Sequence, residues 1–331
     1  MADALALVFE QDEQLARNRT VSSILSDLFR EEEIPTSIYT IFPRFPSGKI
    51  DEYCVSKTQL PKGIKYDLPA LSNKKYLKPE MVVHLSRFKK ELALGGHNCV
   101  LGFGSNVSWA LLGNSRINDV RGATAMSTLV PDLKVVMTHH PFSIFRNPAY
   151  FPICAVDVAK ALEESKQKEM LPFEYSIFVP ETLQDLLEIE YNVMNAEECA
   201  FDIETRLYSI VTCVGFAIGQ IAYVIPFVKE HGENYWGTIA EEMEAWKVVK
   251  NILASPVRKV GQNGLYDIQF LLKQMGIPTM NYCDDTMLAH HALQPELPRS
   301  LGFLGSIYTN APSWKKMNSF KDKFIENREE D

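Results

Sequence analysis

The chain has 331 residues, 46% hydrophobic and 23% charged, which suits about two globular domains and excludes a fibrous or broadly disordered protein. No run of 18 apolar residues occurs, and the first residues lack the basic start and cleavage site of a secretion signal. We therefore expect no membrane partner and a cytoplasmic location. The six cysteines are scattered singly, which predicts reduced thiols and no iron–sulfur cluster.

The net charge of −8 is unevenly divided between the two halves of the chain. Residues 1–170 carry 21 Lys and Arg against 19 Asp and Glu, whereas residues 171–331 carry 13 against 23. The acidic half argues against a broad phosphate-binding face there. A metal-dependent nuclease can nevertheless carry surplus carboxylates and hold nucleic acid locally, so charge alone leaves the partner open.

The first half alternates apolar runs of strand length with helical patterns. Strands are predicted at 5–9, 37–42, 99–103 and 133–138, and helices at 20–29 with Thr20 as N-cap, at 79–93 and at 107–113. This alternation predicts a mostly parallel sheet with helices on both faces. A charged segment then interrupts this alternation of strands and helices. We place a domain boundary there, near 170, which gives domains 1–170 and 171–331.

The second half reads as strands near 198–205, 210–219 and 221–228, a helix, a short strand ending at 263 and another helix from 265. Its first strand carries Asp202 and Glu204, two residues apart and so about 7 Å apart on one face. Two neighbouring carboxylates repel each other, and a hard divalent cation relieves that repulsion. The pair therefore predicts a site for Mg2+ or Mn2+, the alternative being exposed carboxylates at a strand end.

A second acidic motif occurs about sixty residues later. Asn263 and Asp267 lie at the predicted strand-to-helix junction, with Tyr266 beside the acid. A carboxylate in the first turn of a helix can reach back over the end of a neighbouring strand. FDIET followed by GQNxxYD resembles the first two motifs of the DEDD 3'-5' exonucleases, in the version found in family A DNA polymerases. The CDDTMLAHHALQPELPRSLGFLGSIY stretch resembles the next segment of those polymerases.

The resemblance covers about residues 196–310 and implies an RNase H-like (DnaQ-like) domain with a mixed sheet. It implies a two-metal proofreading site, in which ions about 4 Å apart activate a water and stabilise the leaving 3' oxygen of a single-stranded DNA end. The metal ligands and catalytic residues would be Asp202, Glu204 and Asp267. The supporting residues would be Asn263, Tyr266 and Asp285.

The family also needs a third motif, a Tyr or His with an Asp on a later helix. No such motif precedes Asp331, and Tyr308 has no Asp four residues later. We therefore expect the isolated chain to be nearly or wholly inactive, with the motif supplied by a polymerase domain in a longer polypeptide or by a partner chain. His290 and His291 are interpreted as packing or surface residues.

The first half carries a THHP sequence before an apolar, Arg-bearing segment that we predict to be a loop, with a helix beginning near Asp157. Over about residues 4–165 it resembles the uracil-DNA glycosylase superfamily, most closely family 4. The resemblance implies that His140 contacts a flipped base and that residues 142–146, with Ser143 and Arg146, wedge into the duplex. It also implies a parallel-sheet α/β/α fold.

Where the glycosylase chemistry belongs, the sequence departs from that family. Residues 9–13 contain no glycine in place of the Gly-rich water-activating loop, and Ile41 stands where the pocket Asn is expected. We therefore expect a non-catalytic module kept for DNA contact or for docking. Glu10 and Asp12 are the acids left to activate water in the alternative of an active glycosylase.

A glycosylase-like domain followed by an exonuclease resembles certain bacteriophage replicative polymerases, which places the protein in the host cytoplasm. The alternative from another class is a catalytically silent accessory subunit that binds DNA or a polymerase chain. One further hypothesis is a basic DNA-facing patch, against the ordinary interpretation as solvated surface. Its residues would be Arg116, Arg121, Arg146 and the pairs at 74–75 and 89–90.

Overall fold

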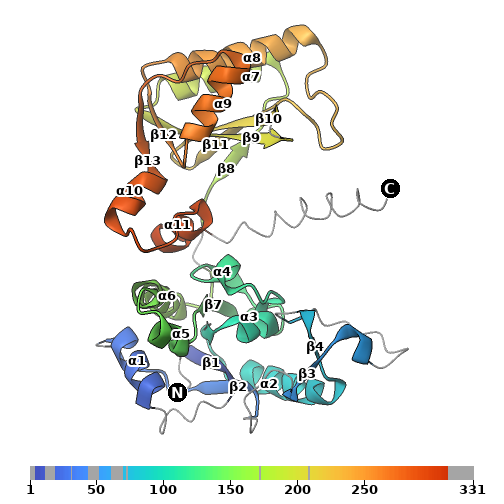
Figure 1. Ribbon diagram of the computed structural model, residues 1–331, viewed down its shortest axis with the longest axis vertical. Coiled ribbons are helices and arrows are strands. Elements are labelled where there is room, and N and C mark those ends of the chain that lie inside the picture. Colours follow the sequence, from blue (N-terminus) through green and yellow to red (C-terminus); the bar gives the residue numbers. More distant parts are fainter. Residues whose placement is uncertain are drawn as a thin grey trace. The chain divides into compact units, whose positions relative to one another are not determined.

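The computed structural model describes residues 4–11, 19–30, 32–43, 52–60, 70–71, 74–170, 173–207 and 209–311 (Figure 1). These form two compact units: unit 1 runs to Phe173 and resumes at Gly302, and unit 2 spans Glu174–Leu301. The sequence-based boundary near 170 assigned every later residue to the second domain. The structure differs in returning the chain to unit 1 after Leu301.

Unit 1 is built on a five-stranded sheet with the order β2-β1-β5-β7-β6. Its parallel strands are β1 (Leu5–Gln11), β2 (Ile38–Phe42), β5 (Cys99–Phe103) and β7 (Lys134–Thr138), and the antiparallel edge strand is β6 (Thr124–Met126). Alternate residues of β1 enter different cores: Leu5, Leu7 and Phe9 on one face, Ala6 and Val8 on the other.

Helices cover both faces of this sheet. The core that contains Leu7 includes residues of α1 (Arg19–Phe29) and α6 (Tyr150–Ser165), and the opposite core includes residues of α2 (Val82–Leu94) and α3 (Ser105–Leu112). The prediction of a mostly parallel sheet between helices is confirmed. The smaller elements are β3 (Cys54–Val55), β4 (Tyr76–Leu77), α4 (Ile117–Val120), α5 (Pro141–Arg146) and the 3-10 helices η2 (Lys57–Gln59) and η4 (Pro79–Met81).

Four local predictions in unit 1 differ from the structure. Helix α1 begins at Arg19, so Thr20 lies inside it and is not its cap. The segment predicted as a loop after His140 is helix α5, because Pro141 occupies its first position and the His140 side chain caps it. Helix α6 begins at Tyr150, seven residues before the predicted start, and the helix predicted from residue 79 opens with a 3-10 turn.

Unit 2 has a six-stranded mixed sheet with the order β13-β12-β9-β10-β11-β8, which confirms the expected mixed sheet. Its strands are β8 (Ser176–Phe178), β9 (Glu198–Arg206), β10 (Ile210–Ile218), β11 (Ile221–Pro226), β12 (Arg258–Gly261) and β13 (Tyr282–Asp285). β10 is antiparallel to β9 and β11, whereas β12 runs parallel to β9 and β13.

The helices after Phe173 are α7 (Leu183–Met194), α8 (Ile239–Ala254), α9 (Leu265–Met275), α10 (Thr286–Leu293) and α11 (Leu301–Tyr308). Thr182 and Thr238 open α7 and α8 with capping boxes, and buried residues of both helices join the core of unit 2. Across the described ranges, no helix combines the length and hydrophobicity needed to cross a bilayer.

Candidate active site

Two carboxylates share the exposed face of strand β9. Residues 199, 201 and 203 of this strand are buried, whereas Asp202 and Glu204 are exposed. Since side chains alternate along a strand, the two acids stand on the same face. In the ladder they pair with Gly215 and Cys213 of β10, neither of which brings a positive charge.

Asp267 reaches the same strand from helix α9. Strand β12 runs parallel to β9 and ends at Gly261, and α9 begins four residues later, which puts Asp267 in its first turn. Asp267 is only 4% exposed, and the backbone amide of Ile203 is near enough to its carboxylate to lower the pKa of that group. Asp267 therefore lies against β9 between the positions of Asp202 and Glu204.

The environment of Asp267 works against its negative charge. Burial and, to a lesser extent, the nearby charge of Asp202 together raise the pKa of this carboxyl to about 7, against the lowering effect of the Ile203 amide. A cation held between the two carboxylates would remove that cost. The donors are carboxylate oxygens, which suit Mg2+ or Mn2+. Within the described part of the chain, no three His, Cys, Asp or Glu side chains are already arranged around a metal position.

Asp285 fixes the turn from which α9 starts. Its carboxylate accepts hydrogen bonds of 2.7–3.3 Å from Tyr282 Oη and from the backbone amides of Asn263, Gly264, Met287 and Leu288. Burial acts to raise the pKa of Asp285, but the Tyr282, Asn263 and Gly264 donors outweigh it and hold the pKa below its usual value. Asp285 thus positions the start of α9, and with it Asp267.

Tyr282 is a part of this arrangement that the sequence analysis missed. A Cβ atom on Gly261 or Gly264 would come within 2.7 or 2.5 Å of the Tyr282 hydroxyl, so both positions need glycine for the ring to approach. The two glycines that flank Gln262 and Asn263 were the signal in the sequence that a large side chain packs closely here. Asn263 has a φ of +60°, a left-handed conformation that Asn adopts more readily than most residues.

The remaining residues singled out in the second half occupy distinct environments. Tyr266 Oη lies 3.1 Å from Thr205 Oγ1, which ties the first turn of α9 to the end of β9. The His290 side chain is 2% exposed, whereas His291 on the same helix is exposed. This agrees with packing and surface roles for the two histidines.

In unit 1, His140 follows β7 and caps α5. Its Nδ1 accepts a hydrogen bond of 3.2 Å from the Phe142 amide, and its carbonyl accepts one of 2.7 Å from the Ser143 amide. The imidazole stacks on Phe142 at 5.3 Å. Beyond the cap, Phe145 is 68% exposed and Arg146 is exposed, so α5 presents an aromatic ring and a guanidinium to solvent.

Glu10 lies in β1 of the same sheet. Its carboxylate accepts hydrogen bonds from Tyr53 Oη and, at 3.0 Å, from Asn106 Nδ2. Ile41, in the position expected for the pocket Asn, is fully buried. Asp12 lies outside the described residues. Of the two acids that the glycosylase alternative could use, Glu10 is therefore engaged in an internal hydrogen-bond cluster.

One member of the predicted basic patch is not on the surface. Arg121 is 3% exposed and forms an ion pair with the buried Asp157, so it cannot face DNA. The sequence shows that Arg121 is charged, but it does not show that the fold pairs this residue with a buried carboxylate. Arg116 and Arg146 are exposed.

Residues 177–328 match the family model of the 3'-5' exonuclease, and this region is accordingly a 3'-5' exonuclease domain. No curated protein matches the sequence significantly.

Among solved structures, the catalytic core of RRP6 from Trypanosoma brucei aligns with a TM-score of 0.36 at 18% identity, covering 45% of this chain and 39% of that one. Escherichia coli RNase D, an exoribonuclease involved in structured RNA processing, aligns with a TM-score of 0.32 at 18% identity, covering 44% and 36%. The Aedes aegypti Nibbler EXO domain aligns with a TM-score of 0.34 at 15% identity, covering 46% of this chain and 77% of that one. The chain thus spans about two fifths of the RRP6 core, and these values identify no substrate.

Proposed function

We propose that the second half of this chain is the proofreading exonuclease of a family A DNA polymerase of bacteriophage type, removing nucleotides from a single-stranded 3' end. The observation that carries the proposal is the approach of Asp267 to β9, where its carboxylate meets the Ile203 amide beside Asp202. Helix α9 and strand β9 bring together acids that are 65 residues apart in the sequence. The match of residues 177–328 to the exonuclease family supports the same proposal.

In this proposal Asp202, Glu204 and Asp267 hold divalent cations, Mg2+ or Mn2+. The cations, when bound, supply an activated water and neutralise charge on the cleaved phosphate. The protein contributes the placement of the ligands: β9 fixes two carboxylates on one face, and Asp285 fixes the turn that aims the third. Tyr266, held to Thr205, borders the same edge.

The proposed site needs a third acidic motif from outside the described residues, supplied by a polymerase domain in the same polypeptide or by a partner chain. The isolated chain would then cut DNA poorly or not at all. The competing proposal is an accessory subunit that binds DNA or a polymerase chain and never cuts. The two proposals predict different results only when the polymerase is present.

A nuclease assay separates them. Single-stranded DNA and RNA with a labelled 3' end are incubated in Mg2+ or Mn2+ with the chain alone and with the polymerase chain. We expect cleavage of the DNA when the polymerase is present, its loss in Asp202→Asn, and its retention in Glu244→Gln, an exposed acid on α8. Absence of cleavage in every mixture would favour the accessory subunit, and preferential cleavage of RNA would contradict the proposed substrate.

For unit 1 we propose a glycosylase-like module that contacts DNA without cutting the glycosidic bond. The exposed Phe145 and Arg146 on α5 support a DNA contact, and the engagement of Glu10 by Tyr53 and Asn106 disfavours water activation. Phe145→Ser with Arg146→Ser is expected to weaken duplex binding, whereas Lys250→Ser on α8 is not. Abasic sites formed in uracil-containing DNA would instead establish an active glycosylase.

A further inference from the structure

Helix α11 belongs by sequence to one half of the chain and by contacts to the other. It lies within the residues that match the exonuclease family, 177–328. The structure nevertheless assigns the chain from Gly302 onward to unit 1. Unit 2 is therefore joined to unit 1 at both of its ends, before Glu174 and after Leu301.

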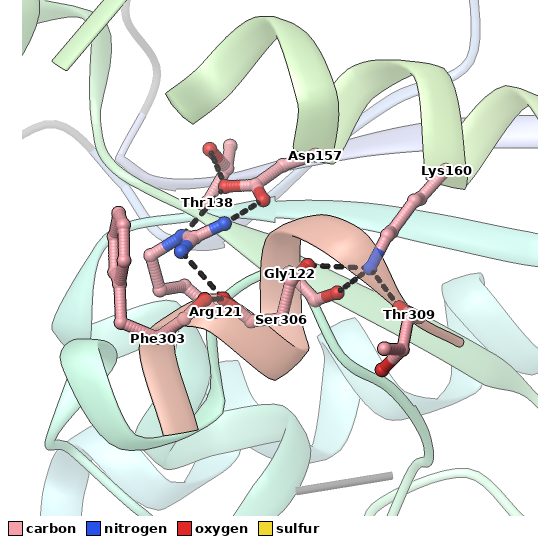
Figure 2. A network of polar contacts seen from close by, with 8 residues as sticks. All are labelled: Arg121, Gly122, Thr138, Asp157, Lys160, Phe303, Ser306 and Thr309. Atoms are coloured by element: carbon pink, nitrogen blue, oxygen red, sulfur yellow. Dashed lines mark hydrogen bonds and ion pairs between the residues drawn. The ribbon is translucent and has the colours of Figure 1, made fainter. Parts of the chain in front are cut away.

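The first contact of α11 is with a buried ion pair. The Arg121 and Asp157 side chains are 2% and 0% exposed, and Asp157 also accepts a hydrogen bond of 2.8 Å from Thr138 Oγ1 (Figure 2). The Asp157 carboxylate accepts hydrogen bonds from Nε and Nη2 of Arg121. The remaining guanidinium nitrogen, Nη1, donates to Ser306 Oγ of α11 at 2.9 Å. Phe303 of the same helix lies under the guanidinium at 5.3 Å.

The second contact is at the C-terminal end of α11. Lys160 Nζ of α6 donates to the carbonyls of Ser306 and Thr309, the latter at 2.7 Å, and to Gly122 O at 3.0 Å (Figure 2). A positive charge at this end also interacts favourably with the helix dipole. All three N–H donors of the Lys160 ammonium group are thus used. Two of them bind carbonyls in the last turn of α11 and at the residue after it.

The chain leaves unit 1 through a similar arrangement. Lys134, fully buried in β7, donates to the carbonyls of Glu164, Gln167 and Glu169 at 2.6–2.9 Å and pairs with the Glu164 carboxylate at 2.8 Å. A lysine from the body of unit 1 therefore fastens the backbone before unit 2, and another fastens it after unit 2.

We propose that unit 1 is an anchoring module with a dedicated binding site for helix α11, formed by Arg121, Asp157 and Lys160, so that unit 2 is fastened at both ends. This role is separate from DNA contact and does not depend on nuclease activity. The helix fits the site in two ways. Ser306 supplies the acceptor that the remaining guanidinium nitrogen needs, and the helix end supplies carbonyls for Lys160.

The test uses the full chain with a protease site inserted between residues 171 and 174. After cleavage, the two fragments remain linked only by noncovalent contacts. We expect the cut wild-type chain to elute as one species at micromolar concentration. Lys160→Met and Ser306→Leu should each weaken the association roughly tenfold or more, because the first removes both hydrogen bonds from Lys160 to the end of α11 and the second removes the acceptor of the buried Arg121 bond. Lys166→Met, at an exposed lysine just after α6, should leave it unchanged.

Each other outcome overturns the proposal. Separation of the cut wild-type fragments would show that α11 does not fasten the chain, and undiminished association in both variants would show that other contacts do. Amide exchange in β5 and β7 reports whether unit 1 stays folded in Lys160→Met. Ser306→Leu lies outside the 1–170 segment, so it tests the site even where Lys160→Met unfolds.

Discussion

Replacing Asp267 by Asn should stabilise the metal-free protein at neutral and higher pH, although it removes a proposed metal ligand. Burial, with the charge of Asp202, raises the pKa of Asp267 to about 7 from an ordinary value of 3.8. The folded state therefore holds this proton more tightly than the unfolded state does. The free energy of unfolding must fall as the pH rises from about 4 to about 7, and it stays low above that range.

The size of the effect comes from the pKa difference. A shift of about 3 units, at 1.36 kcal/mol per unit, corresponds to about 4 kcal/mol as an upper value. Asn has nearly the same shape, cannot ionise, and offers an oxygen that can accept the Ile203 amide. The Asp267→Asn chain should therefore match wild type only below about pH 4 and exceed it by up to about 4 kcal/mol at about pH 8.

Urea unfolding in a chelating buffer measures this difference. Trp236 is buried in unit 2 and Trp246 stacks on Phe227 there, so tryptophan fluorescence includes a signal from this unit. Glu244→Gln, at an exposed acid, is the matched control and should change little at either pH. Equal destabilisation by Asp267→Asn at both pH values would mean that the ionised carboxylate carries no cost in the folded state, which contradicts a raised pKa for Asp267.

Two further substitutions test the positioning residues. Asp285→Ala leaves several amides and the Tyr282 hydroxyl without their acceptor, and at 1–3 kcal/mol for each buried donor it should destabilise unit 2 by about 3 kcal/mol or more in urea; a loss below about 1 kcal/mol would contradict this role. Arg121→Met leaves the Asp157 carboxylate buried without its partner and should cost unit 1 about 3–5 kcal/mol in thermal or urea unfolding. Exposed Arg116→Met should cost less than about 0.5 kcal/mol, and similar losses in the two variants would speak against a buried ion pair.

The sequence predicted well the features that depend on local periodicity. The alternation of apolar and acidic residues around Asp202 predicts a strand with one buried face, and the structure has this pattern in β9. The parallel sheet of unit 1 and the mixed sheet of unit 2 agree with the order of apolar runs and helical patterns. In these segments burial and hydrogen bonding depend on the local residue pattern, so the pattern is sufficient.

The features that the sequence did not predict depend on contacts between distant residues. Ser306 meets Arg121 across 185 positions, and no local pattern shows that α11 packs on unit 1. The family resemblance named Asp285 as a supporting residue, but only the fold shows that its carboxylate accepts hydrogen bonds from two separate turns. Helix α5 was missed because six residues are too few for a helical period to be visible.

Calorimetric titration of the chain with Mn2+ measures directly whether β9 and α9 form a cation site. We expect wild type and Glu244→Gln to bind the ion, and Asp202→Asn and Asp267→Asn each to abolish or strongly weaken the binding. Binding of equal strength in all four proteins, or in none of them, would contradict a divalent-cation site formed by the carboxylates of β9 and α9.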